Sequence, residues 1–121
     1  MIYIREAHPV GGRRRPPEKF QIPDPKTLAE RQKVAEEFAE AVKLSAPILV
    51  DTIDDEVERA YAGWPDRVYI VDPQGKIVHK GEPGPRGFQP SVKEAPAVLD
   101  KLLGKNTGDE QAKKPNAESK P

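Results

Sequence analysis

The chain has 121 residues, a length that fits one small domain and leaves little material for a second core. Its 20 basic and 20 acidic side chains cancel, which argues against an overall field that would attract nucleic acid or an anionic membrane. There is no cysteine, so these residues carry no disulfide, no thiolate metal ligand and no thiol-based mechanism.

The first predicted element is a short strand at residues 2–4, which are β-branched or aromatic. Period-two alternation puts Glu6 and His8 on the same face as the isoleucines of this strand. Chain ends commonly lie some residues before the first packed element, so we expect that the start of the chain is truncated. Residues 9–25 contain several prolines, adjacent glycines and an arginine run, and they predict a long surface loop.

A helix is predicted from Thr27, because Thr27 and Glu30 match a capping box in which hydroxyl and carboxylate each accept from a free backbone amide. Apolar residues then recur at helical spacing against a charged remainder, at Val34, Phe38 and Val42. This pattern predicts an amphipathic helix that packs on one side.

A strand at residues 48–50 follows, and Asp54 or Asp55 is expected to cap a short second helix. The strongest local signal is a hairpin with strands at residues 67–71 and 76–80. Between them stands Asp-Pro-Gln-Gly, in which proline at the second and glycine at the fourth position favour a type I turn.

Residues 81–89 predict an irregular connection, because glycine and proline interrupt them repeatedly. The last helix is expected to start at Ser91 or Ala95 and to end near Leu103. Pro96 leaves both starts open, since an interior proline loses a hydrogen bond and clashes with the preceding turn.

The order of these elements resembles the thioredoxin-like order after its first strand and first helix. Trp64 and Pro65 directly precede the hairpin, where thioredoxin-like proteins have a cis-proline beside the redox centre, and an aromatic residue before proline is compatible with the cis form. We therefore expect the end of the first strand, at Glu6 and His8, to share a pocket with Pro65.

A more specific resemblance is to the iodothyronine deiodinase family, and it spans residues 2–103. Tyr3-Ile4-Arg5-Glu6-Ala7-His8-Pro9 is similar to the family's Tyr-Ile-Glu-Glu-Ala-His-Pro. Further similar stretches follow in the family's order: Ile22-Pro23, Leu28 with Arg31, Pro47 with Leu49-Val50-Asp51, Ala60-Tyr61, Pro65-Asp66-Arg67-Val68-Tyr69-Ile70 and Gly84-Pro85-Arg86-Gly87-Phe88.

The resemblance implies an α/β, thioredoxin-like mixed sheet with flanking helices, here at residues 1–104 and lacking the first strand and first helix. Residues 105–121 have no aromatic or branched aliphatic side chain and predict a disordered tail. The family's activity is reductive removal of iodine from an aromatic substrate by a selenocysteine or cysteine at the head of that first helix, with an external thiol reductant. Without that residue we expect no redox turnover from these 121 residues alone, and no cofactor.

The resemblance also assigns roles to individual residues. Glu6 and His8 match a pair beside the selenol, where the imidazole relays a proton to or from the ring; otherwise they hydrate a strand end. Arg67 matches an arginine of the substrate cleft that pairs with a phenolate or carboxylate; otherwise it is a solvated charge bonded to a nearby acid. Trp64 and Pro65 are expected beside the substrate.

Some positions depart from the family's pattern. Gly11-Gly12-Arg13 or nearby residues replace its Asp-Gly-Trp after His-Pro, and Pro25 stands where the animal enzymes have a loop histidine. The arginine run at residues 13–15 lacks interleaved aromatic residues and predicts a solvated loop. His79, between charged neighbours, is expected to be a surface histidine.

A second hypothesis is a non-catalytic binding or interaction module, either a stable monomer or a homodimer that completes its sheet by strand addition. The enzyme hypothesis predicts instead an exposed edge or apolar groove along Ile2, Ile4 and residues 68–71. His8 and His79 lie far apart, so no metal site is expected. Since the sequence has neither a signal peptide nor an apolar run long enough for a membrane span, we expect a soluble, cytoplasmic protein.

Overall fold

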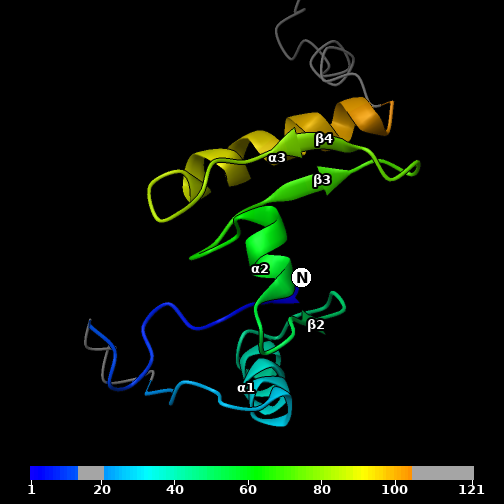
Figure 1. Ribbon diagram of the computed structural model, residues 1–121. Coiled ribbons are helices and arrows are strands. Elements are labelled where there is room, and N and C mark those ends of the chain that lie inside the picture. Colours follow the sequence, from blue (N-terminus) through cyan, green and yellow to red (C-terminus); the bar gives the residue numbers. More distant parts are fainter. Residues whose placement is uncertain (14–20, 105–121) are drawn as a thin grey trace, which may run out of the picture.

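The computed structural model of the chain describes residues 1–13 and 21–104 (Figure 1). The predictions for residues 14–15 of the arginine run and for the tail at residues 105–121 lie outside the described residues. In chain order the elements are β1 (Ile2–Tyr3), α1 (Leu28–Ala41), β2 (Leu49–Val50), α2 (Glu56–Tyr61), β3 (Tyr69–Val71), β4 (Ile77–Lys80) and α3 (Phe88–Leu102). The architecture is mixed α/β, as predicted.

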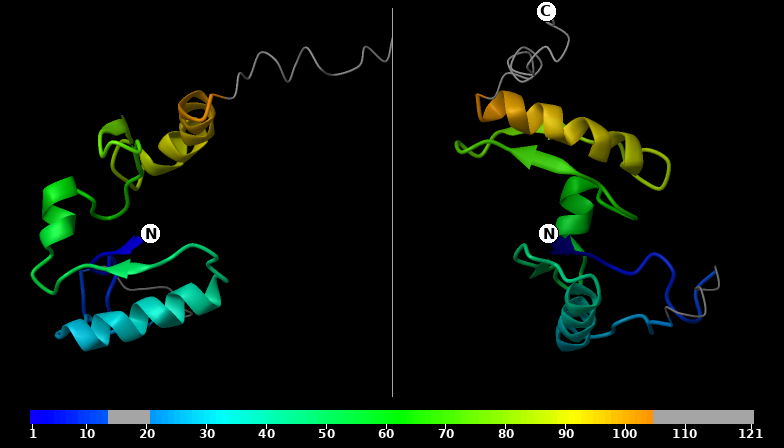
Figure 2. Two further views of the ribbon diagram at one scale, coloured as in Figure 1. Left: turned by 90° about the vertical axis from the view of Figure 1, so that its right-hand side faces the viewer. Right: turned by 180° about the vertical axis from the view of Figure 1, so that it is seen from behind.

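The first sheet is built from β1 and β2, which pair in parallel. Ile2 lies opposite Leu49, and Tyr3 lies opposite Val50. Helix α1 covers one side of this pair (Figure 2), where the rings of Tyr3 and Phe38 lie 5.9 Å apart. β1, β2 and α1 thus form a small two-layer unit, in which the apolar side of the helix packs against the sheet as expected.

The start of α1 follows the predicted capping box in its first half. The hydroxyl of Thr27 accepts from the backbone amide of Glu30 at 3.2 Å, whereas the Glu30 carboxylate accepts from the amide of Lys26 at 2.7 Å, one residue before the expected donor. The apolar stripe is only partly buried, because β1 and β2 have two residues each and cover part of the helix. Ala35 is fully buried, but Val42 remains 52% exposed.

The cap of α2 differs from the prediction. Asp55 stands at the N-cap position, but its side chain makes no capping hydrogen bond and instead accepts from Arg31 Nη2 at 3.0 Å. The cap is the carboxylate of Asp51, which accepts from the backbone amides of residues 52, 57 and 58 at 2.8–2.9 Å. The prediction therefore holds for the position of Asp55 and is wrong for its side chain, because Arg31 already engages that carboxylate.

The predicted hairpin is confirmed, with strands shorter than expected. β3 and β4 pair antiparallel, with Ile70 opposite His79 and an irregularity in register before Val71. The turn closes through a hydrogen bond from the amide of Gly75 to the carbonyl of Asp72 at 3.0 Å. The four-residue turn sets which residues face each other across the ladder, as the sequence indicated.

Helix α3 begins before both predicted starts. It starts at Phe88, so that Ser91 and Ala95 both lie inside it, and it continues through Pro96. Pro90 falls in the first turn, where a missing amide costs little because first-turn amides have no partner inside the helix. The repeated prolines therefore did not prevent the first turn, and the prediction of an irregular connection up to residue 89 is wrong for its last two residues.

Close packing fixes α3 onto the end of β4. The hydroxyl of Ser91 accepts from the amide of Glu82 and donates to the carbonyl of Gly87, both at 2.8 Å. A Cβ atom on Gly81 would lie 2.8 Å from the Cβ of Ser91, closer than real side chains come. Gly81 is therefore required for this approach of helix and strand.

The strands form two separate two-stranded sheets, β1–β2 and β3–β4, which lie on either side of α2 (Figures 1 and 2). The carbonyl of Tyr3 accepts from the amide of Asp51, directly after β2, and the carbonyl of Val68 accepts from the amide of Gly81. Because backbone groups alternate in direction along a strand, those of Ile2 and Tyr69 point toward edges without a partner strand in the described part of the chain. Ile2 is 43% exposed there. None of the described helices combines the length and apolar composition needed to span a membrane.

Replacing Asp51 by alanine should lower the free energy of unfolding by roughly 2–4 kcal/mol, because the backbone amide of residue 52 and two amides in the first turn of α2 lose a buried, charged acceptor. Urea unfolding followed by circular dichroism measures the change. The matched control is Asp54→Ala, an exposed aspartate in the same turn, which should change stability by less than about 0.5 kcal/mol. Equal effects of the two substitutions would contradict the assignment of the cap.

Candidate functional site

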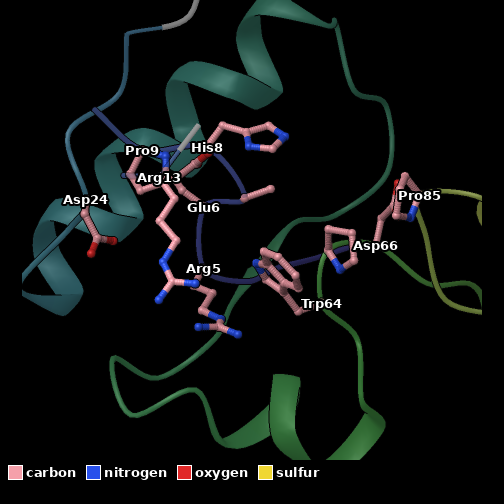
Figure 3. A pocket seen from close by; sticks show the side chains of 11 residues that line it. Arg5, Glu6, His8, Pro9, Arg13, Asp24, Trp64, Asp66 and Pro85 are labelled. Atoms are coloured by element: carbon pink, nitrogen blue, oxygen red, sulfur yellow. The ribbon is translucent and has the colours of Figure 1, made fainter. Parts of the chain in front are cut away.

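A pocket of about 760 Å³ lies where the segment after β1 meets the segment between α2 and β3 (Figure 3). It brings together four of the five residues that the sequence singled out, namely Glu6, His8, Trp64 and Pro65. The other lining residues are Arg5, Ala7, Pro9, Arg13, Asp24, Asp66 and Pro85. The walls are therefore partly apolar, from alanine, prolines and tryptophan, and partly charged with both signs.

One wall follows from the path of the chain after β1. Beyond His8 the chain turns, and a parallel bridge joins Val10 to Pro23, with the amide of Val10 donating to the carbonyl of Ile22 at 2.8 Å. This bridge returns the chain to the segment after β1 and sets Asp24 at the pocket. The described ends of the predicted long surface loop, residues 9–13 and 21–25, thus lie next to each other beside the site.

The opposite wall begins where α2 ends. Ala62 ends the helix with a left-handed φ of 48°, and the peptide bond between Trp64 and Pro65 is cis. Arg5 joins this wall to the first one, since its guanidinium lies 5.1 Å from the centre of the Trp64 ring and its Nε lies 3.8 Å from a carboxylate oxygen of Glu58. A residue on the β1 side therefore contacts both the tryptophan and the helix that precedes it.

Asp66 forms the far end of the pocket together with the loop after β4. The amide of Gly84 donates to the carbonyl of Asp66 at 2.9 Å, and a Cβ atom at Gly84 would overlap Asp66 Oδ1. That carboxylate oxygen is buried and has no hydrogen-bond partner among the described residues. Gly84 thus lets the loop that carries Pro85 close onto the pocket.

Burial raises the pKa of the Glu6 carboxyl above its ordinary value, and the nearby negative charge of Asp24 raises it further, while the positive charge of Arg31 acts in the opposite direction. A carboxyl with a raised pKa keeps its proton to higher pH, which suits a group that donates a proton to a bound molecule. Glu6 and the exposed ring of His8 then offer two proton-exchanging groups to the same pocket.

Arg67 does not line the pocket. Its Nε donates to the carbonyl of Gly81 at 2.7 Å, and its Nη1 donates to the carbonyls of Tyr61 and Ala62 at the end of α2. The guanidinium also lies 5.4 Å from the centre of the Tyr69 ring. Arg67 therefore ties α2 to the hairpin, and its role in substrate binding stays a prediction.

Sequence reasoning missed several residues at or near this site. Arg5 and Asp24 were not candidates, although the departure of Arg5 from the family's glutamate was a usable signal. His79 is also not the surface residue that was expected: its Nε2 is buried and has no hydrogen-bond partner among the described residues. The cause is its position opposite Ile70, which is buried. No cluster of three or more metal-ligating side chains occurs in the parts of the chain that the structure describes.

Comparison with known proteins finds similar deiodinases. A family model described as iodothyronine deiodinase matches residues 1–103. The chain is 34% identical over 106 residues to type I iodothyronine deiodinase of Xenopus laevis, with 84% of this chain and 38% of that protein covered. It is 31% identical over 89 residues to thyroxine 5-deiodinase of Gallus gallus, with 74% and 34% covered. The chain thus spans little more than a third of the length of these two relatives.

The raised pKa of Glu6 predicts a pH-dependent effect of Glu6→Gln on stability. Ionisation of Glu6 costs more in the folded than in the unfolded chain, so the cost is absent below the unfolded pKa and grows as pH rises through the folded pKa. The variant should match the parent chain near about pH 4 and exceed its stability near about pH 7. Urea unfolding across this range measures the difference.

Glu36→Gln, on the exposed side of α1, is the control for removing one negative charge. A stability difference between Glu6→Gln and the parent that stays constant, or shrinks, as pH rises would contradict the burial of the Glu6 carboxyl.

Proposed function

The chain belongs to the iodothyronine deiodinase family, and we propose that its pocket is the proton-handling half of a deiodinase-type active site. The observation that carries this proposal is the meeting of Glu6 and His8 with Trp64 and Pro65 in one partly apolar pocket. An aromatic ring fits apolar walls, and the two proton-exchanging groups lie where that ring would bind.

The proposal includes a thioredoxin-like fold for residues 1–104, completed by one further strand between the two sheets. β3 is the strand of its hairpin that lies nearer to the β1–β2 pair (Figure 1). The backbone groups of Ile2 and Tyr69 lie at edges that face no strand among the described residues. Ile2 and Val71 are 43% and 49% exposed, so a strand inserted there would also bury apolar surface.

The redox group comes from outside residues 1–121, since they contain no cysteine. In the proposed reaction a selenol or thiol takes the iodine from the aromatic ring, while the ring carbon gains a proton in its place. An external thiol reductant then supplies two electrons, is oxidised to a disulfide, releases iodide and restores the selenol or thiol. Glu6 and His8 hold and transfer the proton at the ring.

As 121 residues alone, the chain has no redox turnover under this proposal. The second candidate function is a non-catalytic binding module, and it rests on the same pocket, which needs no thiol to hold a small aromatic molecule. The two candidates differ in one requirement. Only the enzyme requires that a thiol or selenol supplied to the site reacts with the bound ring.

A fusion protein tests this requirement. The first strand and first helix of the Xenopus laevis relative, with cysteine as the redox residue, are joined before Met1, and iodide release from thyroxine is measured with dithiothreitol as reductant. We expect turnover from the fusion protein and none from the 121-residue chain. Glu6→Gln and His8→Ala in the fusion should each lower the rate by roughly 100-fold, the usual contribution of a positioned acid or base.

A fusion with serine in place of that cysteine is the matched control and should be inactive. A folded, cooperatively melting fusion protein that releases no iodide would favour the binding module. Turnover that is unchanged by both Glu6→Gln and His8→Ala would contradict the proton-handling role of the pocket.

A further inference from the structure

Two guanidinium groups line the pocket close to its tryptophan. Arg5 comes from the segment after β1 and Arg13 from the turn beyond Pro9, and both side chains are turned toward the same part of the pocket in front of Trp64 (Figure 3). Like charges that gather in one place repel each other, and an anion bound between them removes this repulsion. Their common direction therefore suits an anionic ligand.

The carboxylates of residues 1–13 and 21–104 account for little of this charge. Asp24 forms its ion pair with Lys26 at 3.6 Å, and Arg13 has no ion pair within 4.0 Å among the described residues. Arg5 forms one ion pair, in which its Nε lies 3.8 Å from a carboxylate oxygen of Glu58. This ion pair is weak, because the side chain of Arg5 is 46% exposed to solvent.

The remaining lining carboxyls lie elsewhere or carry less charge. Asp66 stands at the far end of the pocket beside Pro85 (Figure 3). Burial raises the pKa of Glu6, which favours its neutral form. The guanidinium groups of Arg5 and Arg13 thus keep most of their donors for a bound molecule.

We infer that Arg5 and Arg13 form a carboxylate-binding site, so that the pocket takes an aromatic acid whose ring lies against Trp64, Pro65 and Pro85. This rests on the proposed function, in which the same pocket holds a halogenated ring. Guanidinium groups match the planar geometry of a carboxylate and bond to it through charge-assisted hydrogen bonds. The apolar wall and the two arginines are separate parts of one pocket, so ring and carboxylate are recognised independently.

A pair of probes of nearly equal shape tests the inference with the 121-residue chain. Meta-iodobenzoate carries the carboxylate, and meta-iodobenzyl alcohol replaces it by a neutral hydroxymethyl group. Trp64 is the only tryptophan of the chain and lines the pocket, so its fluorescence reports binding directly through quenching by iodine. We expect the acid to bind at least roughly tenfold more tightly than the alcohol, the effect of one charge-assisted hydrogen bond.

Variants assign the difference to the two arginines. Arg5→Gln and Arg13→Gln should each weaken binding of the acid roughly tenfold and leave the affinity for the alcohol unchanged. Glu58→Gln frees Arg5 from its acidic neighbour and should strengthen binding of the acid. Arg59→Gln, an exposed arginine of α2 outside the pocket, is the matched control and should change neither affinity. Circular dichroism of each variant verifies its fold.

The outcomes separate this inference from the function on which it rests. Equal affinity for acid and alcohol, or affinity for the acid that survives both arginine substitutions, overturns the carboxylate site while the aromatic pocket stands. Absence of saturable quenching by either iodinated probe overturns both the site and the proposed aromatic pocket.

Discussion

The structure depends on a buried arginine and a buried aspartate that lie together beneath the start of α2. Arg31, 2% exposed, donates to the backbone carbonyls of residues 51 and 52 and pairs with Asp55, while Asp51, 1% exposed, accepts from three backbone amides. A buried charge without partners would cost several kcal/mol, so these groups fix each other's positions. They join α1, the end of β2 and α2. This polar network matters for the fold because the sheets contribute few buried apolar side chains.

The same network determines where the pocket lies. Because Asp51 sets the start of α2, it also sets the end of that short helix, from which the chain passes directly to Trp64 and Pro65. Glu58, whose amide bonds to the Asp51 carboxylate, carries the side chain that reaches Arg5 on the opposite wall. The position of the pocket between two small sheets is therefore a consequence of helix capping more than of sheet pairing.

Local signals in the sequence predicted local structure well. The Thr27 cap and the hairpin turn at residues 72–75 each depend on residues within a few positions of one another, and both are present. The sequence did not show that Asp51 caps α2 or that Arg67 bonds to Gly81, because such contacts depend on which segments meet in space. The start of α3 was placed too late because proline is unfavourable inside a helix but tolerated in its first turn. Glu6, His8 and Pro65 could be grouped only through resemblance to a family, since nothing in their spacing brings them together.

Charge in the pocket links ligand binding to proton transfer. The pKa of Glu6 is raised first by burial and then by Asp24, which the Val10–Pro23 bridge holds in place. Under the proposed function, a ligand carboxylate bound at Arg5 and Arg13 brings a further negative charge into the same pocket, although the two guanidinium groups offset part of its effect. Negative charge near a carboxyl favours its protonated form, so the bound acid and the proton on Glu6 stabilise each other. In such a site Glu6 stays protonated while the aromatic ring that would receive the proton is bound.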